Sequence, residues 1–137
     1  MKIVFMGTPA FAAFFLESLL KTPHEIACVV TQPDRPAGRG RVLTPPPVKE
    51  VALAAGIPVL QPDDLKSEEF ENALREYQAD LFVVVAYSIL PKKILTLSRL
   101  GALNVHGSLL PKYRGAAPVQ RAIANGELQT GVTVFLL

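Results

Sequence analysis

The stretch Asp80-Leu81-Phe82-Val83-Val84-Val85-Ala86, near the middle of a chain of 137 residues, decides the fold. Its central residues are all large and apolar. In a half-exposed strand a polar residue would stand at every second position, and here none does. Such a continuous run is typical of a parallel strand that is buried on both faces. It therefore predicts an α/β domain in which helices cover both faces of a sheet.

Strand and helix patterns alternate on both sides of this stretch. Strands are predicted at 2–6, 25–31, 57–61, 101–105 and 130–137, the third of them at a sheet edge because Pro58 and Pro62 flank it. Helices are predicted at 9–20, 48–55, 67–77, 92–97 and 118–124, with Thr8 and Ser67 as N-caps. The alternation predicts a Rossmann-like open, mostly parallel sheet with helices on both faces, which ends inside its last strand.

Composition and charge narrow the class of protein. Half of the residues are hydrophobic and 19% are charged, which is typical of a globular domain and excludes general disorder. A net charge of +2 is too small to indicate nucleic-acid binding by itself. The single cysteine, Cys28, lies in an apolar run, so we expect a buried, reduced thiol. Without a leader or a long apolar run, we expect a cytoplasmic protein with no membrane contact, and the few Cys and His predict no metal.

The predicted strand at 101–105 leads into a polar pair. Asn104 and His106 are two positions apart, so their side chains leave an extended backbone from the same face, while Val105 points the other way. The amide can donate to a developing oxyanion, and the imidazole can take a proton from an incoming amine. This pair suits acyl-type transfer. For an isolated Asn-x-His triplet, a capping Asn and a hydrogen-bonded loop histidine are the simpler interpretation, because such triplets are common.

The longer string decides between these interpretations. Residues 104–118 read Asn-Val-His-Gly-Ser-Leu-Leu-Pro-Lys-Tyr-Arg-Gly-Ala-Ala-Pro and closely resemble the active-site motif of the folate-dependent formyltransferases, which move a formyl group from 10-formyltetrahydrofolate to an amine. The resemblance implies that Asn104 and His106 are catalytic. It assigns folate binding to the four residues that follow, Ser108, Leu109, Leu110 and Pro111.

The loop after Ala86 belongs to the same predicted site. Ligands of open α/β sheets bind beyond the carboxyl ends of central strands, so this loop and the one after Val105 should line one crevice. The family typically has Ala-Tyr-Gly-x-Ile-Leu-Pro here, whereas this chain is one residue shorter and has Ser88 in place of the glycine. The resemblance still implies folate contacts from the backbone of Ile89 and Leu90.

The opening strand is followed by Gly7-Thr8-Pro9. A phosphate-binding glycine loop is one interpretation of a strand, a glycine and a helix in this order. The spacing Gly-x-Gly-x-x-Gly of dinucleotide-binding loops is not present, which disfavours such a site. A Gly-Thr-Pro opening instead resembles the family members that act on methionyl-tRNA.

Positive charge is concentrated at 35–49, which contains Arg35, Arg39, Arg41 and Lys49 and no acidic residue. Prolines and glycines predict a flexible loop at 32–47, and arginine forks in such a loop can hold the phosphates of a polyanion. A solvated surface loop is the simpler interpretation without further context. However, Gln-Pro-Asp-Arg-Pro-Ala-Gly-Arg-Gly at 32–40 resembles the insertion loop with which members acting on methionyl-tRNA engage the acceptor arm. The resemblance assigns tRNA binding to Arg35, Arg39 and Arg41.

The chain stops inside an apolar strand, so we expect it to be part of a longer protein. In the family, the strand with Thr-Gly-Val-Thr, here at 130–133, leads into a loop that carries an aspartate partnering the histidine. No residue of this chain can be given that role. The resemblance implies that residues 1–137 form the amino-terminal part of the catalytic domain, inactive alone, and that the rest of that domain and a carboxy-terminal tRNA-binding domain lie outside this chain.

The function implied is formyl transfer from 10-formyltetrahydrofolate to initiator methionyl-tRNA, for translation initiation. We expect the partners to be this tRNA and the folate, and the protein to be a monomer. A sibling formyltransferase that acts on another amine, either a nucleotide sugar or glycinamide ribonucleotide, is one alternative. A non-catalytic folate-binding module is the other, if the protein ends at Leu137.

Overall fold

The computed structural model describes residues 1–107, 110, 112, 114–116, 118–127, 129 and 131–137. Within them, one sheet has the strand order β5-β2-β1-β6-β7-β8. Neighbouring strands run parallel, except that β8 is antiparallel to β7. The strands are β1 (Lys2–Gly7), β2 (Glu25–Val30), β5 (Val59–Leu60), β6 (Leu81–Val85), β7 (Ala102–His106) and β8 (Thr133–Leu136). This open, mostly parallel sheet confirms the predicted fold class.

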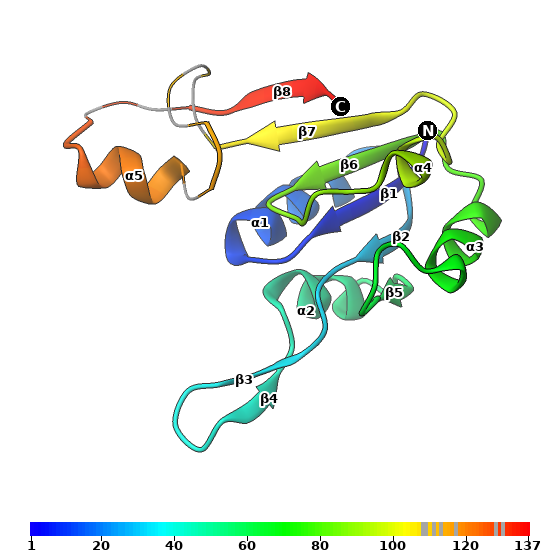
Figure 1. The fold of residues 1–137 in the computed structure, drawn as a ribbon, viewed down its shortest axis with the longest axis horizontal. Coiled ribbons are helices and arrows are strands. Elements are labelled where there is room, and N and C mark those ends of the chain that lie inside the picture. The colour runs from blue at the N-terminus through cyan, green and yellow to red at the C-terminus, as the bar shows by residue number, and fades with distance from the viewer. Residues whose placement is uncertain (108–109, 111, 113, 117, 128, 130) are drawn as a thin grey trace.

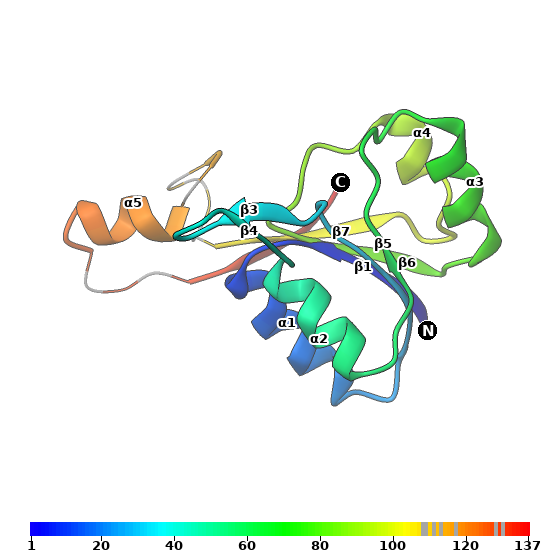
Figure 2. The same cartoon turned by 90° about the horizontal axis from the view of Figure 1, so that it is seen from below.

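Helices cover both faces of the sheet (Figures 1 and 2). One face carries α1 (Ala10–Leu20) and α2 (Pro47–Ala54), and the opposite face carries α3 (Glu68–Glu76) and the short α4 (Lys92–Leu95). The last helix, α5 (Pro118–Ala124), lies beyond the carboxyl end of β7 in both views. Among the described residues, no helix combines the length and the apolar character needed to cross a bilayer.

Strand β6 confirms the prediction made from its apolar run. It lies between β1 and β7, and all of its residues are buried. Val83 and Val85 belong to the cluster under α1 and α2, whereas Phe82 and Val84 belong to the cluster under α3 and α4. Both faces of the strand are therefore core, which is why its sequence does not alternate.

The turn from β1 to α1 corrects one prediction. Pro9, rather than Thr8, is the residue before the helix, and no side chain caps the first turn. The hydroxyl of Thr8 instead accepts a hydrogen bond from the backbone N–H of Gln32, 3.3 Å away. Thr8 lies beside the end of β2. The backbone N–H of Gln32, just beyond that strand, therefore takes the place of the helix N–H. The predicted cap at Ser67 is confirmed, because its Oγ accepts from the N–H of Phe70 at 3.2 Å.

A two-stranded hairpin replaces the predicted flexible loop at 32–47. It consists of β3 (Arg35–Ala37) and β4 (Val42–Thr44), which pair antiparallel and extend away from the central sheet (Figure 1). Gly38, Gly40 and Arg41 have positive φ angles of 69°, 77° and 49°, which lets the chain reverse between the strands. The prediction failed because Pro36 argues against a strand, although a short, isolated ribbon tolerates a residue without an N–H group.

Candidate active site

The carboxyl ends of three parallel strands lie side by side at one edge of the sheet. Gly7 at the end of β1 pairs with Val85 of β6, and Val85 in turn pairs with Val105 of β7. Thr8 and Ala86, which follow β1 and β6, and His106, the last residue of β7, are therefore brought to the same edge. The predicted crevice would lie along this edge.

Strand β7 delivers the polar pair to this edge. Asn104 pairs with Val84 of β6 on one side and with Phe135 of β8 on the other. Val105 is only 7% exposed and packs in the cluster under α1 and α2. Because side chains alternate along a strand, Asn104 and His106 leave β7 from the opposite face, which carries α3 and α4. Both are half-buried, so they are shielded by the fold yet open to a ligand.

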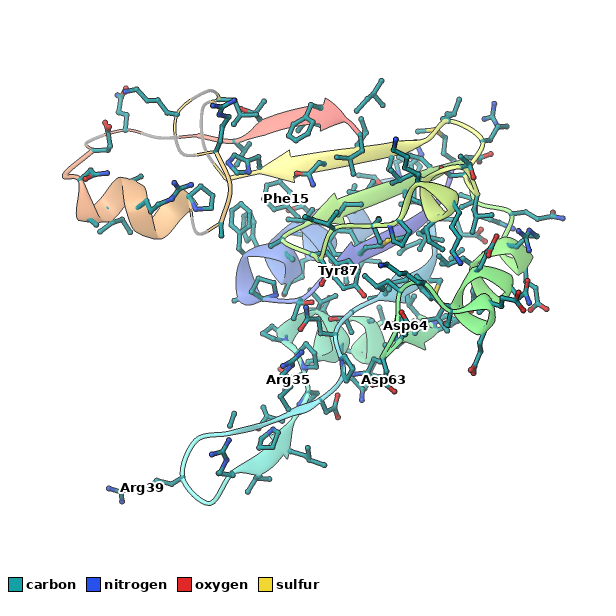
Figure 3. All side chains as sticks on the ribbon, viewed as in Figure 1. Phe15, Arg35, Arg39, Asp63, Asp64 and Tyr87 are labelled. Carbon is teal, nitrogen blue, oxygen red and sulfur yellow. The ribbon has the colours of Figure 1, made fainter. Side chains whose placement is uncertain are left out.

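The loop after β6 starts from an unusual backbone conformation. Ala86 has a φ of 50°, in the left-handed region that residues with a Cβ seldom adopt. The next residue, Tyr87, lies over the sheet in Figure 3, and burial raises the pKa of its hydroxyl to about 12. A phenol is already neutral at physiological pH, and burial keeps the Tyr87 hydroxyl protonated at still higher pH, so it can donate a hydrogen bond there.

The two predicted folate contacts in this loop have opposite environments. The side chain of Ile89 is 96% exposed, whereas Leu90 is 8% exposed and packs in the cluster with Phe82 and Val84. Leu90 thus anchors the loop with its side chain, which leaves its backbone for a ligand. The side chain of Leu90 thus holds the loop, and the preceding residue, Ile89, exposes an apolar side chain to solvent.

Part of the predicted folate segment has a defined place. The backbone N–H of Leu110 donates to Oγ1 of Thr133 over 3.1 Å, which ties this segment to the start of β8. The other three predicted folate residues, Ser108, Leu109 and Pro111, lie outside the residues that the structure describes.

The three predicted tRNA contacts lie on or beside the hairpin. Arg39 extends from its tip in Figure 3, and Arg41 is also exposed. Arg35 lies at its root, where its Nη2 donates to Oε1 of Gln32 over 3.0 Å. Lys49 does not join them, because its ammonium contacts the carboxylate of Asp34 at 3.0 Å.

A hollow of about 250 Å³ lies at the root of the hairpin. Its walls include Thr8, Gln32, Arg35 and residues 45–47, so it adjoins the turn after β1. A second hollow, of about 320 Å³, lies between the loop after β5 and α3 and is lined by Asp63 and Asp64, among others (Figure 3). The first hollow therefore lies between Arg35 and the turn after β1, whereas the second is lined by neither.

Sequence reasoning missed the residues that brace the hairpin. Gln61 donates from Nε2 to Oδ1 of Asp34 at 2.7 Å and to the backbone oxygen of Gln32 at 3.0 Å. The Gln61 and Lys49 contacts, in that order, hold the pKa of the Asp34 carboxyl below its usual value. No periodic pattern could have found this group, because its members come from the segment after β2, from α2 and from the loop after β5.

Curated proteins that resemble this chain include methionyl-tRNA formyltransferases of several bacteria. A family model described as Formyl transferase matches residues 1–137. The methionyl-tRNA formyltransferases of Moorella thermoacetica and Desulfotalea psychrophila are each 58% identical to this chain over 136 residues, or 98% of it. These residues make up 44% and 42% of the two relatives, so the chain spans less than half of their length.

Solved structures share the fold at lower identity. The phosphoribosylglycinamide formyltransferase of Bacillus halodurans aligns with the whole chain and 72% of its own, with a TM-score of 0.71 and 23% identity. A formyltetrahydrofolate deformylase of Pseudomonas syringae aligns with 99% of the chain and 45% of its own, with a TM-score of 0.68 and 22% identity. These likenesses concern the fold, and the match of the family model over residues 1–137 shows that the chain belongs to the formyl transferase family.

Proposed function

We propose that this chain is part of an enzyme that transfers a formyl group from 10-formyltetrahydrofolate to the amino group of initiator methionyl-tRNA, for translation initiation. The observation that carries the proposal is the 58% identity, over nearly the whole chain, to proteins named methionyl-tRNA formyltransferase. The geometry supports it, since Asn104 and His106 leave one face of β7 beside the loop after β6.

Asn104 and His106 have separate roles in this proposal. The methionyl amine attacks the formyl carbon, a new C–N bond forms, and the bond from that carbon to folate nitrogen breaks. Asn104 donates a hydrogen bond to the carbonyl oxygen as negative charge develops on it. His106 takes a proton from the attacking amine, and the departing folate nitrogen receives one. The folate supplies the one-carbon unit, and the chain holds the reactants in line.

The folate lies, in this proposal, between the loop after β6 and the segment after β7. Ile89 and Leu90 contact it through their backbone, and the anchored side chain of Leu90 keeps that backbone in place. The remaining contacts come from Ser108, Leu109, Leu110 and Pro111. No metal is needed for this reaction, because the amine is itself the nucleophile.

The acceptor tRNA lies against the hairpin in this proposal. Arg35, Arg39 and Arg41 approach its phosphates, since guanidinium forks bind phosphate oxygens in pairs. The hairpin holds them on one projecting ribbon whose root adjoins the carboxyl edge of the sheet (Figure 1). This placement lets one substrate bridge from the arginines to the reacting pair.

The relatives are more than twice as long as the matched segment, which supports a proposal about the whole protein. Residues 1–137 would form the amino-terminal part of the catalytic domain. The rest of that domain, with the aspartate that orients His106, and a tRNA-binding domain would complete the enzyme. We propose a cytoplasmic monomer, and we expect residues 1–137 alone to show no turnover.

An acceptor competition tests the proposal. The full gene product is given 10-formyltetrahydrofolate with equal concentrations of methionyl-tRNA, glycinamide ribonucleotide and an amino-sugar nucleotide. We expect formyl transfer to methionyl-tRNA alone. Transfer to glycinamide ribonucleotide would favour the activity named for the similar solved structures. Folate binding without any transfer would make the protein a binding module.

A further inference from the structure

Gln32 is bonded through all four of its polar groups. Its backbone N–H donates to Thr8 at 3.3 Å, and its backbone oxygen accepts from Gln61 at 3.0 Å. Its side-chain oxygen accepts from Nη2 of Arg35 at 3.0 Å, and its side-chain nitrogen donates to Oγ of Ser88 at 3.0 Å. Both ends of the side-chain amide are thus occupied, which fixes its orientation.

The amide of Gln32 joins two segments that are far apart in sequence. Arg35 begins β3 of the hairpin, and Ser88 lies in the loop after β6, 56 residues beyond Gln32. This loop is anchored by Leu90 on one side of Ser88 and begins at the left-handed Ala86 on the other. One side chain therefore connects Arg35, at the root of the hairpin, with the loop assigned to the folate.

The root of the hairpin is braced while its strands are exposed. Asp34 accepts from Lys49 and from Gln61, and Gln61 also holds the backbone of Gln32. In contrast, the residues of β3 and β4 are all exposed. A ligand that restrains Arg35 therefore acts on a segment that these hydrogen bonds hold to the body of the domain.

Ser88 makes this link a feature of the present chain. The folate-dependent formyltransferases that the sequence resembles typically have glycine at this place, and glycine has no hydroxyl to accept from Gln32. The shortened loop from Tyr87 to Pro91 thus has, in place of a glycine, a hydroxyl that accepts a hydrogen bond from the Gln32 amide at 3.0 Å.

We propose that Gln32 is a positioning residue that couples the two substrates, so that methionyl-tRNA and the folate bind with positive cooperativity. The inference rests on the proposed function. A guanidinium has five N–H donors, so Arg35 can hold a phosphate and Gln32 at once. A phosphate on Arg35 holds the guanidinium that Gln32 contacts and so stabilises the hydrogen-bonded arrangement of Gln32 and Ser88. The folate binds to the loop in this arrangement, so each substrate stabilises the conformation that the other one binds.

The test measures a coupling factor in the full gene product. Tetrahydrofolate carries no formyl group, so it forms a complex with the enzyme and methionyl-tRNA in which no transfer occurs. We expect its Kd, measured anaerobically, to fall at least about five-fold when methionyl-tRNA is saturating. By linkage, saturating tetrahydrofolate should lower the Kd of methionyl-tRNA by the same factor.

Four single variants and one double variant test whether the coupling depends on the hydrogen bond between Gln32 and Ser88. Gln32→Ala and Ser88→Ala should each bring the factor close to one, and the double variant should change it no further, because both break the same link. Ser88→Thr keeps a hydroxyl and should retain the factor. Ser18→Ala is the matched control, since it removes an exposed serine hydroxyl on α1 that only bonds the backbone of Phe14. Thermal unfolding confirms that each variant folds.

Three outcomes would overturn the inference, and they differ in what they say about the proposed function. A wild-type factor of one, with both ligands bound, overturns the coupling and leaves the formyl transfer standing. Weaker binding by Gln32→Ala with the factor unchanged reduces Gln32 to a structural role. Failure of methionyl-tRNA or tetrahydrofolate to bind at all overturns the proposed function and the coupling with it.

Discussion

The ammonium of Lys49, in the first half of α2, lies 3.0 Å from the carboxylate of Asp34 at the root of the hairpin. Counted along the sequence, Lys49 adds to the arginines of the hairpin. In the fold it is neutralised by Asp34, whose pKa is lowered by the hydrogen bond from Gln61 and then by Lys49 itself. The positive charge offered to a polyanion is therefore that of the arginines.

Removing the Asp34–Lys49 pair as a unit should have little effect on tRNA binding. In Asp34→Asn with Lys49→Met, the net charge is unchanged and the exposed arginines remain. We expect an affinity for methionyl-tRNA within about two-fold of the wild type, and an equal salt dependence, in filter binding. A loss as large as that of an arginine variant would show that Lys49 contacts the tRNA.

Neutralising the tip of the hairpin should weaken tRNA binding and flatten its salt dependence. Each arginine–phosphate interaction that Arg39→Ala or Arg41→Ala removes should lower the slope of log K against log salt by about 0.7 to 0.9. Tetrahydrofolate affinity should not change. Arg75→Ala is the control, because Arg75 pairs with Glu71 on α3, away from the hairpin. Equal slopes for the tip variants and the wild type would make the hairpin an ordinary surface.

Truncating Asn104 should slow the chemical step. If its amide acts as a single oxyanion donor, Asn104→Ala lowers kcat by about 10² to 10³, with little change in tetrahydrofolate affinity. Asn72→Ala serves as control, since Asn72 accepts from Arg75 on the surface of α3. Single-turnover formylation measures the step directly. Unchanged turnover would remove Asn104 from the mechanism.

Gly7 is required by the close approach of β1, β6 and α1. A Cβ at this position would lie 2.6 Å from the backbone oxygen of Val85 and 2.7 Å from Cβ of Ala12. We expect Gly7→Ala to lower the free energy of unfolding by about 1 to 3 kcal/mol, as overpacking does. Gly40→Ala is the comparison, because it meets open space and costs only backbone strain. A Tm of Gly7→Ala equal to or above that of Gly40→Ala would contradict the crowding.

Burial of Cys28 predicts an alkaline loss of stability. Burial raises the pKa of the thiol from 9.0 to about 11, more than its hydrogen bonds to Tyr77 and Val29 lower it. Because the folded pKa is the higher one, this stabilisation is fully present below pH 9.0 and is lost as the pH rises to about 11. The free energy of unfolding should fall less steeply over this range in Cys28→Ala. Fast labelling of the native thiol would show that Cys28 is not buried.

Much of the fold could be predicted because its signals are local. The apolar run at 81–85 indicated a strand buried on both faces, and the structure places it between β1 and β7. The cap at Ser67 needed only the residues of one turn. The hairpin was missed because Pro36 and the glycines resemble a loop in any window of that length, and only the pairing of Arg35–Ala37 with Val42–Thr44 makes it a ribbon.

The sequence by itself determined which side chains share a face, because the alternation of a strand depends only on consecutive residues. It therefore placed Asn104 and His106 together and Val105 opposite them. Only the tertiary structure decided what lies next to them. The strand order brings Gln32, two residues beyond β2, to the loop that follows β6, and the hydrogen bond to Ser88 spans 56 residues. Contacts across such distances depend on how the strands assemble, and no local pattern in the chain carries that information.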